Sequence, residues 1–471
     1  MSKFNWKEIP ILLDKFKDEC GVFGIYDRDG LDVSLLTYFG LYSIQHRGQE
    51  SAGIAVSNGD EIIYHKGTGL VPEVFDEDNI DRLRQGSIAI GHVRHSTSDG
   101  NLPQNTQPLV TKYKKGNMAI AHNGALINAS TLRDELENVG AIFQTNTDSE
   151  VMANIIARTS DKGLEEALKT MMSRIKGAYA LTMMTEDSLI GIRDPHGIRP
   201  LALGILDDSY VIASETCAFD VIGAEYIRDV RPGEIIIITK DGLKSIQTPV
   251  PLESSFCLFE FVYFARTDSV IDGISVQASR REAGRILARE SPADADIVIG
   301  VPDSGTTAAL GYAEEANIPY AEGLIKNRYV GRTFIKPTQA IREQDIRIKL
   351  NALRRIVRGK RIVMVDDSIV RGTTSRAIVD MLRLTGAREI HMRISSPIIK
   401  YPCHFGIDTP DRQALIGANF SEEEICEQLG VDSLNYISID GLLKTVESSG
   451  ASFCLGCFNG KYPIECKGGC K

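Results

Sequence analysis

The sequence predicts two successive domains, first an α+β domain built on antiparallel sheet and then an α/β domain built on a parallel sheet. Short runs with two-residue alternation, such as CGVFGIYD and NMAIAHNG, recur from Cys20 to about residue 250 and are typical of strands. The segment TPVPLESS at residues 248–255 is rich in Pro and Ser and indicates a domain boundary. Beyond it, the continuous apolar runs DIVIGVP and RIVMVDD are typical of strands buried on both faces.

The first domain, which we place at residues 20–250, mixes predicted strands with predicted helices. Its strand-like runs are CGVFGIYD, GSIAIGHVRH, NMAIAHNG, AYALTMM, SYVIASE and EIIIIT. Amphipathic helical stretches interrupt them around residues 34–46, 130–139, 149–158 and 164–175. This mixture predicts an α+β domain on antiparallel sheet.

The second domain, which we place at residues 251–450, has a different order of elements. Each apolar run is followed by a turn of Ser, Thr and Gly and then by a helical stretch, TTAALGYAEEAN or TTSRAIVDMLRLTG. The order strand, loop, helix predicts a doubly wound parallel sheet, whose ligands bind at the carboxyl ends of the strands. A short C-terminal segment, residues 451–471, carries a Cys-x-x-Cys pair.

Composition and charge exclude several classes of protein. The chain has 471 residues, enough for two or three domains, and its net charge of −10 argues against nucleic-acid binding through bulk charge. No run approaches the ~18 apolar residues of a membrane span, and the N-terminus is a poor signal peptide, so we expect a cytoplasmic protein. Nine cysteines, an odd number, do not suit a complete disulfide framework and point to metal binding or catalysis.

The stretch VMVDDSIVRGTTS at residues 363–375 predicts a phosphate site. A buried strand ends in two carboxylates, and a glycine turn leads into a helix whose N-terminal N–H groups suit a phosphate. An ordinary strand–turn–helix with a capping hydroxyl is the alternative. Paired aspartates at a strand end, however, need solvent, a cation or a hydroxyl-bearing ligand to balance them. The residues concerned are Asp366, Asp367, Gly372, Thr373, Thr374 and Ser375.

This stretch closely resembles the phosphoribosyl pyrophosphate motif of type I phosphoribosyltransferases. The resemblance implies that Asp366 and Asp367 hold the ribose hydroxyls and contribute to Mg²⁺ binding. It also implies that Gly372 and the three hydroxyl residues after it hold the 5′-phosphate.

Two further segments fit the same ligand. The run VPDSG ends the other buried strand and would offer Ser304 to Mg²⁺ and pyrophosphate. The basic run KNRYVGRTF at residues 326–334 resembles a mobile lid, with Lys326 and Arg332 on the substrate. Taken alone, that run would be interpreted as a solvated basic loop.

A second set of motifs surrounds Cys20. A lone cysteine is usually a small buried hydrophobe, but this one opens CGVFGIYD, and four short motifs accompany it. These are QHRGQES at 45–51, GHVRHST at 91–97, HNGAL at 122–126 and DSE at 148–150. Together they resemble the glutaminase domain of the N-terminal-nucleophile amidotransferases.

The resemblance assigns roles residue by residue. Cys20 would be the nucleophile, with Asn123 and the Gly124 N–H as its oxyanion hole. Glutamine would be bound by Arg94 at its α-carboxylate and by Asp148 at its α-amino group, with Arg47 beside the nucleophile.

Cys20 needs a base that takes up its thiol proton. From the residues alone, several histidines are open as that base: His46, His92, His95 and His122. In the family, the base is instead the free α-amino group of the cysteine itself, whose reference pKa of about 7.7–8.0 lies close to working pH. That role requires removal of residues 1–19 as a propeptide by cleavage between Glu19 and Cys20.

Four cysteines lie too far apart in sequence for a zinc finger of standard spacing: Cys257, Cys403, Cys454 and Cys457. Four thiolates can hold a [4Fe–4S] cluster; zinc and unligated buried thiols are the alternatives. Their sequence contexts resemble the propeptide-bearing, iron–sulfur branch of the glutamine phosphoribosylpyrophosphate amidotransferases. The resemblance implies a structural cluster that joins the C-terminal segment to the second domain.

The family resemblance implies a glutamine-dependent amidophosphoribosyltransferase activity, the first committed step of purine synthesis. The products would be 5-phosphoribosylamine, glutamate and pyrophosphate. It also implies a homotetramer, and inhibition by purine nucleotides near the lid and Lys349. Two rivals differ in class: a regulator that binds phosphoribosyl pyrophosphate without turnover, and a glutaminase that feeds ammonia to another acceptor. The intact glutaminase motifs argue against the first, and the phosphoribosyl pyrophosphate motif argues against the second.

Overall fold

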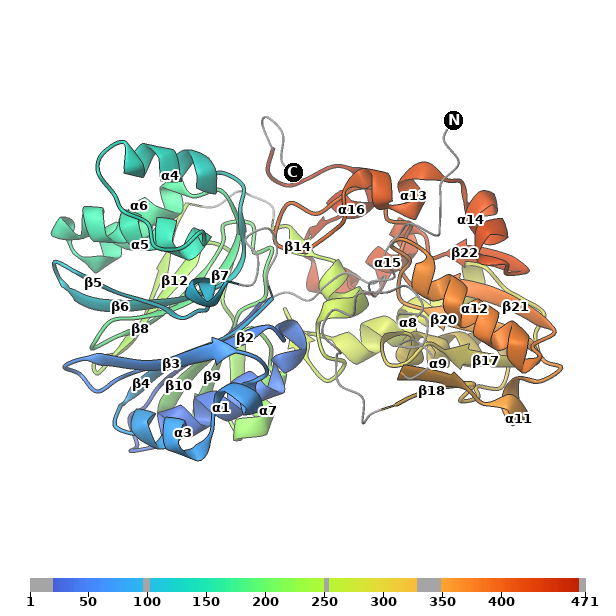
Figure 1. The fold of residues 1–471 in the computed structure, drawn as a ribbon, viewed down its shortest axis with the longest axis horizontal. Coiled ribbons are helices and arrows are strands. Elements are labelled where there is room, and N and C mark those ends of the chain that lie inside the picture. The colour runs from blue at the N-terminus through green and yellow to red at the C-terminus, as the bar shows by residue number, and fades with distance from the viewer. Residues whose placement is uncertain (1–19, 96–101, 250–253, 328–348, 466–471) are drawn as a thin grey trace.

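The computed structural model describes residues 20–95, 102–249, 254–327 and 349–465, arranged as two domains side by side (Figure 1). The predicted propeptide, the predicted cleavage bond and Arg332 of the predicted lid lie outside these residues. No helix in the described part of the chain is both long enough and apolar enough to span a membrane.

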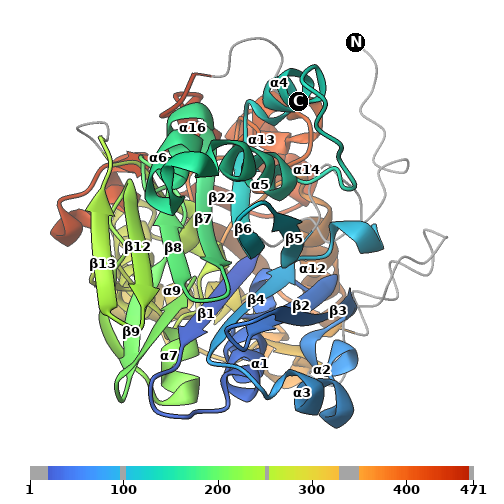
Figure 2. The same ribbon diagram turned by 90° about the vertical axis from the view of Figure 1, so that its left-hand side faces the viewer.

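The N-terminal domain is a sandwich of two antiparallel sheets between two layers of helices (Figure 2). The first sheet has the order β11-β9-β10-β1-β4-β2-β3. Its strands are β1 (Gly21–Tyr26), β2 (Ser51–Ser57), β3 (Ile62–Thr68), β4 (Ile88–Arg94), β9 (Ala202–Leu206), β10 (Ser209–Ala213) and β11 (Glu225–Asp229). The second sheet has the order β13-β12-β8-β7-β6-β5. Its strands are β5 (Leu109–Tyr113), β6 (Gly116–Leu126), β7 (Gly177–Met184), β8 (Leu189–Arg193), β12 (Glu234–Thr239) and β13 (Gly242–Gln247).

Helices cover the outer face of each sheet. The first sheet carries α1 (Val33–Ser43), α2 (Val71–Val74), α3 (Glu77–Leu83) and α7 (Cys217–Ile222), and the second carries α4 (Ala129–Glu137), α5 (Asp148–Thr159) and α6 (Leu164–Arg174). All six residues of β1 are buried, because Phe23 and Ile25 pack toward the helices while Val22 and Tyr26 pack between the sheets. The predicted α+β sandwich is confirmed.

The C-terminal domain is built on a four-stranded parallel sheet of order β17-β20-β21-β22. Its strands are β17 (Ile297–Gly300), β20 (Arg361–Asp366), β21 (Glu389–Ile394) and β22 (Ser433–Tyr436). Helices α8 (Val276–Glu290) and α9 (Ser304–Ala316) pack on one face, and α12 (Thr373–Thr385) and α14 (Glu422–Leu429) on the other. The predicted α/β domain with a parallel sheet is confirmed.

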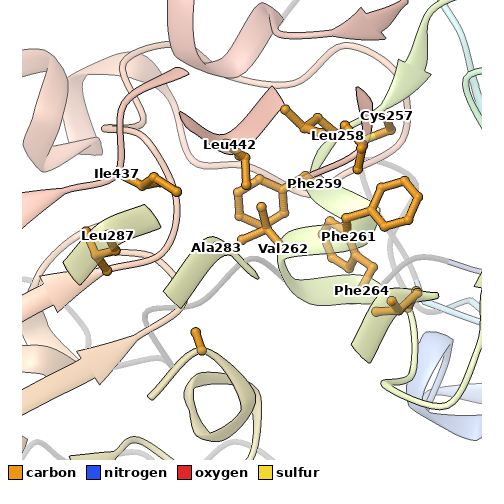
Figure 3. Close-up of a cluster of buried hydrophobic side chains, with 14 of the residues drawn as sticks. Cys257, Leu258, Phe259, Phe261, Val262, Phe264, Ala283, Leu287, Ile437 and Leu442 are labelled. Carbon is orange, nitrogen blue, oxygen red and sulfur yellow. The ribbon is translucent and has the colours of Figure 1, made fainter. Parts of the chain in front are cut away.

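Smaller elements complete this domain. Short strands pair as β14 (Phe256–Cys257) with β23 (Phe453–Cys454), β15 (Val270–Ile271) with β16 (Ile274–Ser275), and β18 (Leu324–Lys326) with β19 (Leu350–Ala352). Short helices are α11 (Arg354–Val357), α13 (Ile416–Asn419), α15 (Ile439–Lys444) and α16 (Gly456–Asn459). A single π-helical turn, η4 (Glu260–Phe264), follows β14 at the domain boundary. Phe261 and Phe264 of this turn, and Phe259 directly before it, lie in the buried cluster of Figure 3.

Candidate active sites

A cavity of about 370 Å³ at the ends of the two N-terminal sheets contains five of the residues predicted to act on glutamine. Its lining includes Cys20, Arg94, Asn123, Gly124 and Asp148. Cys20 directly precedes β1 and Arg94 ends β4, the neighbour of β1 in the first sheet. Asn123 and Gly124 belong to β6 of the second sheet. The facing sheets therefore bring together residues that are far apart in the sequence.

The side-chain amide of Asn123 can donate a hydrogen bond to a ligand. Its side chain is 1% exposed, and neither of its polar atoms has a hydrogen-bond partner among the described residues. An unpaired buried amide is costly, so a ligand oxygen that accepts from Nδ2 would remove that cost. Next to it, Gly124 has φ of +133°, and a Cβ there would lie 2.1 Å from the Ala178 carbonyl oxygen. Only glycine fits this position.

Asp148 lines the cavity and is held by the backbone of β6. It is the first residue of α5, and its Oδ2 accepts a hydrogen bond from the Leu126 N–H at 2.7 Å. This bond joins the start of the helix to the end of β6, the strand that carries Asn123. The carboxylate is only partly buried, so it can also meet a cationic group of a ligand.

Two of the four candidate histidines are poorly suited to act as bases. Burial lowers the pKa of His92 to about 3 and that of His122 to about 4. His46 lies 2.7 Å from Glu215, within a buried cluster of charges. The Cys20 thiol donates to the His95 carbonyl oxygen at 3.5 Å, so this contact involves the backbone and not the ring.

Arg47, the sixth residue of the predicted glutaminase set, lies beside Cys20. Its guanidinium lies behind Cys20 and is absent from the cavity lining. Its Nη1 is 2.7 Å from Glu215, its Nη2 is 2.7 Å from Glu260, and its Nε donates to the Cys20 carbonyl oxygen at 3.2 Å. Two carboxylates, Glu215 and Glu260, thus balance the charge of Arg47. Arg47 supports the nucleophile from behind.

Sequence reasoning missed a contribution of the C-terminal domain to this cavity. Gly406 lines it and packs directly on Gly124, with φ of +112°. A Cβ at Gly406 would lie 3.0 Å from the Cα of Gly124. The only available signal was the position of this glycine shortly after Cys403. The missed carboxylates Glu215 and Glu260 carried no motif.

The second predicted site lies at the carboxyl ends of β17 and β20. Asp366 and Asp367 are 1% and 0% exposed. Ser304, the first residue of α9, donates its hydroxyl hydrogen bond to Asp367 Oδ2, and Ser368 donates to Oδ1 at 2.5 Å. The parallel pairing of β17 with β20 brings these segments together, as predicted for a shared ligand.

The turn after the two aspartates leads into α12, as the motif predicted. Gly372 caps the helix with φ of +86°, in the left-handed region that glycine adopts without strain. Thr373 is buried, and its Oγ1 has no hydrogen-bond partner among the described residues. Ser375 is also buried. With Thr374, these residues surround the N-terminus of a 13-residue helix, where an anion is favoured.

Of the two predicted lid residues assigned to the substrate, Lys326 lies within the described residues. It ends β18, is half exposed, and its Nζ lies 2.5 Å from Asp303 Oδ2, next to Ser304. This ion pair links Lys326 to the loop after β17, at the same edge of the sheet as Ser304.

The four predicted cluster cysteines share one buried region. Cys257 pairs with Cys454 across β14 and β23, and Cys403 and Cys457 pack against the same core. Burial and the neighbouring Cys403 thiol raise the pKa of Cys454 to about 12. Within the described ranges, no three Cys, His, Asp or Glu side chains are grouped to hold a single metal ion. The four thiols fit an iron–sulfur cluster in donor type and burial.

Comparison with known proteins agrees with both sites. The family model of the glutamine amidotransferase domain matches residues 92–221, and that of the phosphoribosyl transferase domain matches residues 273–395. Amidophosphoribosyltransferase of Bacillus subtilis strain 168 is 51% identical over 453 residues, covering 95% of this chain and 94% of the relative. The enzyme of the same name from Archaeoglobus fulgidus is also 51% identical, covering 95% and 99%.

Solved structures show the same two-domain arrangement. Glutamine phosphoribosylpyrophosphate amidotransferase from B. subtilis, complexed with ADP and GMP, superimposes with a TM-score of 0.89 at 51% identity, covering 95% of this chain and 98% of that chain. A structure described as the allosteric regulatory enzyme of purine biosynthesis gives a TM-score of 0.91 at 50% identity, covering 96% and 98%. The chain therefore belongs to the amidophosphoribosyltransferase family of enzymes, which join a glutamine amidotransferase domain to a phosphoribosyltransferase domain.

Proposed function

We propose that this chain releases ammonia from glutamine at Cys20 and transfers it to C1 of phosphoribosyl pyrophosphate at the Asp366–Ser375 site. The products are 5-phosphoribosylamine, glutamate and pyrophosphate, as in the first step of purine synthesis. The observation that carries the proposal is the cavity that gathers Cys20, Arg94, Asn123, Gly124 and Asp148 from four separate places in the sequence.

The glutaminase reaction follows from the charges in this cavity. Arg94 binds the α-carboxylate of glutamine as a fork and Asp148 its α-amino group, which directs the amide toward Cys20. The thiolate attacks the amide carbon, and the oxygen that becomes negative accepts hydrogen bonds from Asn123 Nδ2 and the Gly124 N–H. Ammonia leaves with a proton from the base. Water then cleaves the thioester and releases glutamate.

The α-amino group of Cys20 is the base in this scheme. The low pKa values of His92 and His122 support that choice, because such weak bases accept little of the thiol proton at pH 7. The scheme requires cleavage after Glu19, so residues 1–19 act as a propeptide. Intact mass spectrometry of the active enzyme tests this, and retention of those residues in fully active protein would contradict it.

The transferase reaction uses the other domain. The N–H groups and hydroxyls from Gly372 to Ser375 bind the 5′-phosphate, and Asp366 and Asp367 accept hydrogen bonds from the ribose hydroxyls. Lys326, and Arg332 of the predicted lid, balance the charge of the departing pyrophosphate while ammonia attacks C1. Exclusion of water from the closed site protects the reactive sugar.

Two inorganic groups are part of the proposal. Asp366, Asp367 and Ser304 offer the oxygen donors that Mg²⁺ prefers, and the ion would neutralise charge on the pyrophosphate. A [4Fe–4S] cluster on Cys257, Cys403, Cys454 and Cys457 would have a structural role, since it would hold four separate segments together.

Regulation and assembly remain predictions for this chain. The B. subtilis relative was solved with ADP and GMP, which supports purine nucleotides as regulators here too. We expect such a nucleotide to bind beside Lys349. The backbone carbonyl oxygen of Lys349 accepts a hydrogen bond at 2.8 Å from the N–H of Asn327, the residue after Lys326. A cytoplasmic homotetramer is the expected form.

Anaerobic turnover tests the proposed function. Pyrophosphate and glutamate release are measured with phosphoribosyl pyrophosphate, Mg²⁺ and either glutamine or ammonia. We expect coupled release of both products with glutamine. Pyrophosphate release with ammonia but not with glutamine would mean that the glutaminase is inactive or unprocessed. Binding of the sugar phosphate with no pyrophosphate from either nitrogen source would instead support a regulator.

A further inference from the structure

A buried cluster of four charges joins the two domains behind the nucleophile. It consists of Arg47, Arg199 and Glu215 from the N-terminal domain and Glu260 from the C-terminal domain, each at most 2% exposed. Arg47 binds Glu260 through two nitrogens, at 3.0 Å and 2.7 Å. Arg199 Nη1 lies 3.7 Å from the same carboxylate. Glu260 is thus the C-terminal domain's contribution to the charge balance of Arg47.

A hydrogen bond connects this cluster to the reacting residue. Arg47 Nε donates to the Cys20 carbonyl oxygen at 3.2 Å. The fork of the guanidinium is planar, so a carboxylate that holds its two terminal nitrogens also sets the direction of Nε. The orientation of Glu260 is therefore transmitted to the backbone of Cys20, whose thiol and amino group must both point at the substrate.

Glu260 itself sits on a rigid support. It begins the π-helical turn η4, and π-helical turns occur frequently at functional sites. Arg280 of α8 donates to the Phe261 and Ala265 carbonyl oxygens, both at 2.7 Å, and so ties the two ends of the turn. Phe259 and Phe261 anchor it in the hydrophobic cluster with Ala283 and Leu442 (Figure 3). The carboxylate has little freedom to move away from Arg47.

We infer that Glu260 is a positioning residue for the glutaminase reaction, acting across the domain boundary through Arg47 on Cys20. This inference rests on the proposed role of Cys20 as the nucleophile. It predicts that a residue of the phosphoribosyltransferase domain, outside the glutamine cavity, sets the rate of glutamine cleavage without taking part in glutamine binding.

The test compares Glu260→Gln with Asp272→Asn in the full-length, processed enzyme. Gln keeps the size of Glu260 but removes its charge and one acceptor. Asp272 is the matched control, because it also pairs across the domain boundary, with Arg193 at 3.2 Å. Glutamine-dependent and ammonia-dependent turnover are measured for both variants, together with the rate at which iodoacetamide alkylates Cys20.

For Glu260→Gln we expect the glutamine-dependent kcat to fall about tenfold to a hundredfold, as a small misplacement of a reacting group does. The KM for glutamine should stay near the wild-type value because Arg94 and Asp148 are untouched. Alkylation of Cys20 should slow, while ammonia-dependent turnover is retained. Glu260→Asp keeps the charge and should recover part of the loss. For Asp272→Asn we expect no change in the ratio of the two activities.

Three outcomes would overturn the inference. In the first, Glu260→Gln keeps the wild-type ratio of glutamine to ammonia turnover. In the second, Asp272→Asn lowers that ratio equally. In the third, the KM rises while kcat is unchanged. If Glu260→Gln does not fold, as loss of ammonia-dependent turnover would reveal, the same ratio in Glu260→Asp decides. A processed wild-type enzyme that cleaves no glutamine would instead defeat the proposed function itself.

Discussion

The two sites of this enzyme are built in opposite ways. The phosphate site comes mainly from one continuous stretch, residues 363–375, in which a strand end, a turn and a helix start follow one another. The glutamine cavity draws single residues from strands of two facing sheets and from a helix, and it is closed by Gly406 of the other domain. A continuous site depends on local geometry, whereas a composite site depends on the packing of the whole domain and its neighbour.

The largest expected effect separates the two sites completely. Cys20→Ala should reduce glutamine-dependent product formation by at least about a thousandfold, because the nucleophile is lost. Ammonia-dependent turnover should survive, since the Asp366–Ser375 site is intact. Pyrophosphate release with each nitrogen source measures both. Loss of the ammonia reaction as well would mean that the two sites are not separable.

Removal of the oxyanion donor should have the next largest effect. Asn123→Ala should lower the glutamine-dependent kcat by about a hundredfold to a thousandfold. The buried amide has no hydrogen-bond partner among the described residues, so its removal breaks none of the contacts that the structure assigns to it. The melting temperature should therefore change little. A large loss of stability with normal catalysis would show that the amide has a structural role instead.

The continuous site should lose both reactions together. Asp366→Asn combined with Asp367→Asn removes the two carboxylate charges that we propose to bind the ribose hydroxyls, and we expect turnover with either nitrogen source to fall about tenfold to a hundredfold. The rate of Cys20 alkylation without substrates is the control and should be unchanged. A variant that lost only the glutamine reaction would contradict the assignment.

The smallest effect concerns acid stability of the composite site. Burial lowers the pKa of His92 from 6.5 to about 3 in the folded state. The unfolded chain therefore binds a proton that the folded chain does not, so stability is fully present above pH 6.5 and is lost as the pH falls toward 3. Between pH 6.5 and 5.5 this should cost about 1 kcal/mol.

The free energy of unfolding against pH measures this effect, with His92→Gln as the comparison. The variant should have a shallower slope below pH 6.5. Equal slopes would mean that His92 titrates alike in the folded and unfolded chains.

The sequence predicted the fold class because its periodicities are local, but it did not predict strand pairing. The runs CGVFGIYD and SYVIASE were recognised as strands, yet nothing in them indicates that β10 pairs with β1. Two strands of the parallel sheet, β21 and β22, were missed. β21 carries the charged Arg393, which is buried in the structure, and β22 has only four residues, so neither forms a continuous apolar run.

The same distinction holds within the sites. Asp366, Asp367 and Gly372 were predicted from one motif, and the structure places them together. Arg47 was assigned to glutamine because its motif accompanies Cys20, but its position depends on Glu215 and Glu260, which are remote in sequence. Charges that meet only through packing leave no pattern along the chain.

The parallel pairing of β14 with β23 has a consequence for the order of folding during synthesis. β14 begins the C-terminal domain, directly before the turn that carries Glu260, but its partner β23 leaves the ribosome long afterwards. The sheets of the N-terminal domain can form while the rest of the chain is still being made. The junction between the domains has to wait for residues 453–454. A nascent chain would thus hold a folded but incompletely supported first domain until synthesis is almost finished.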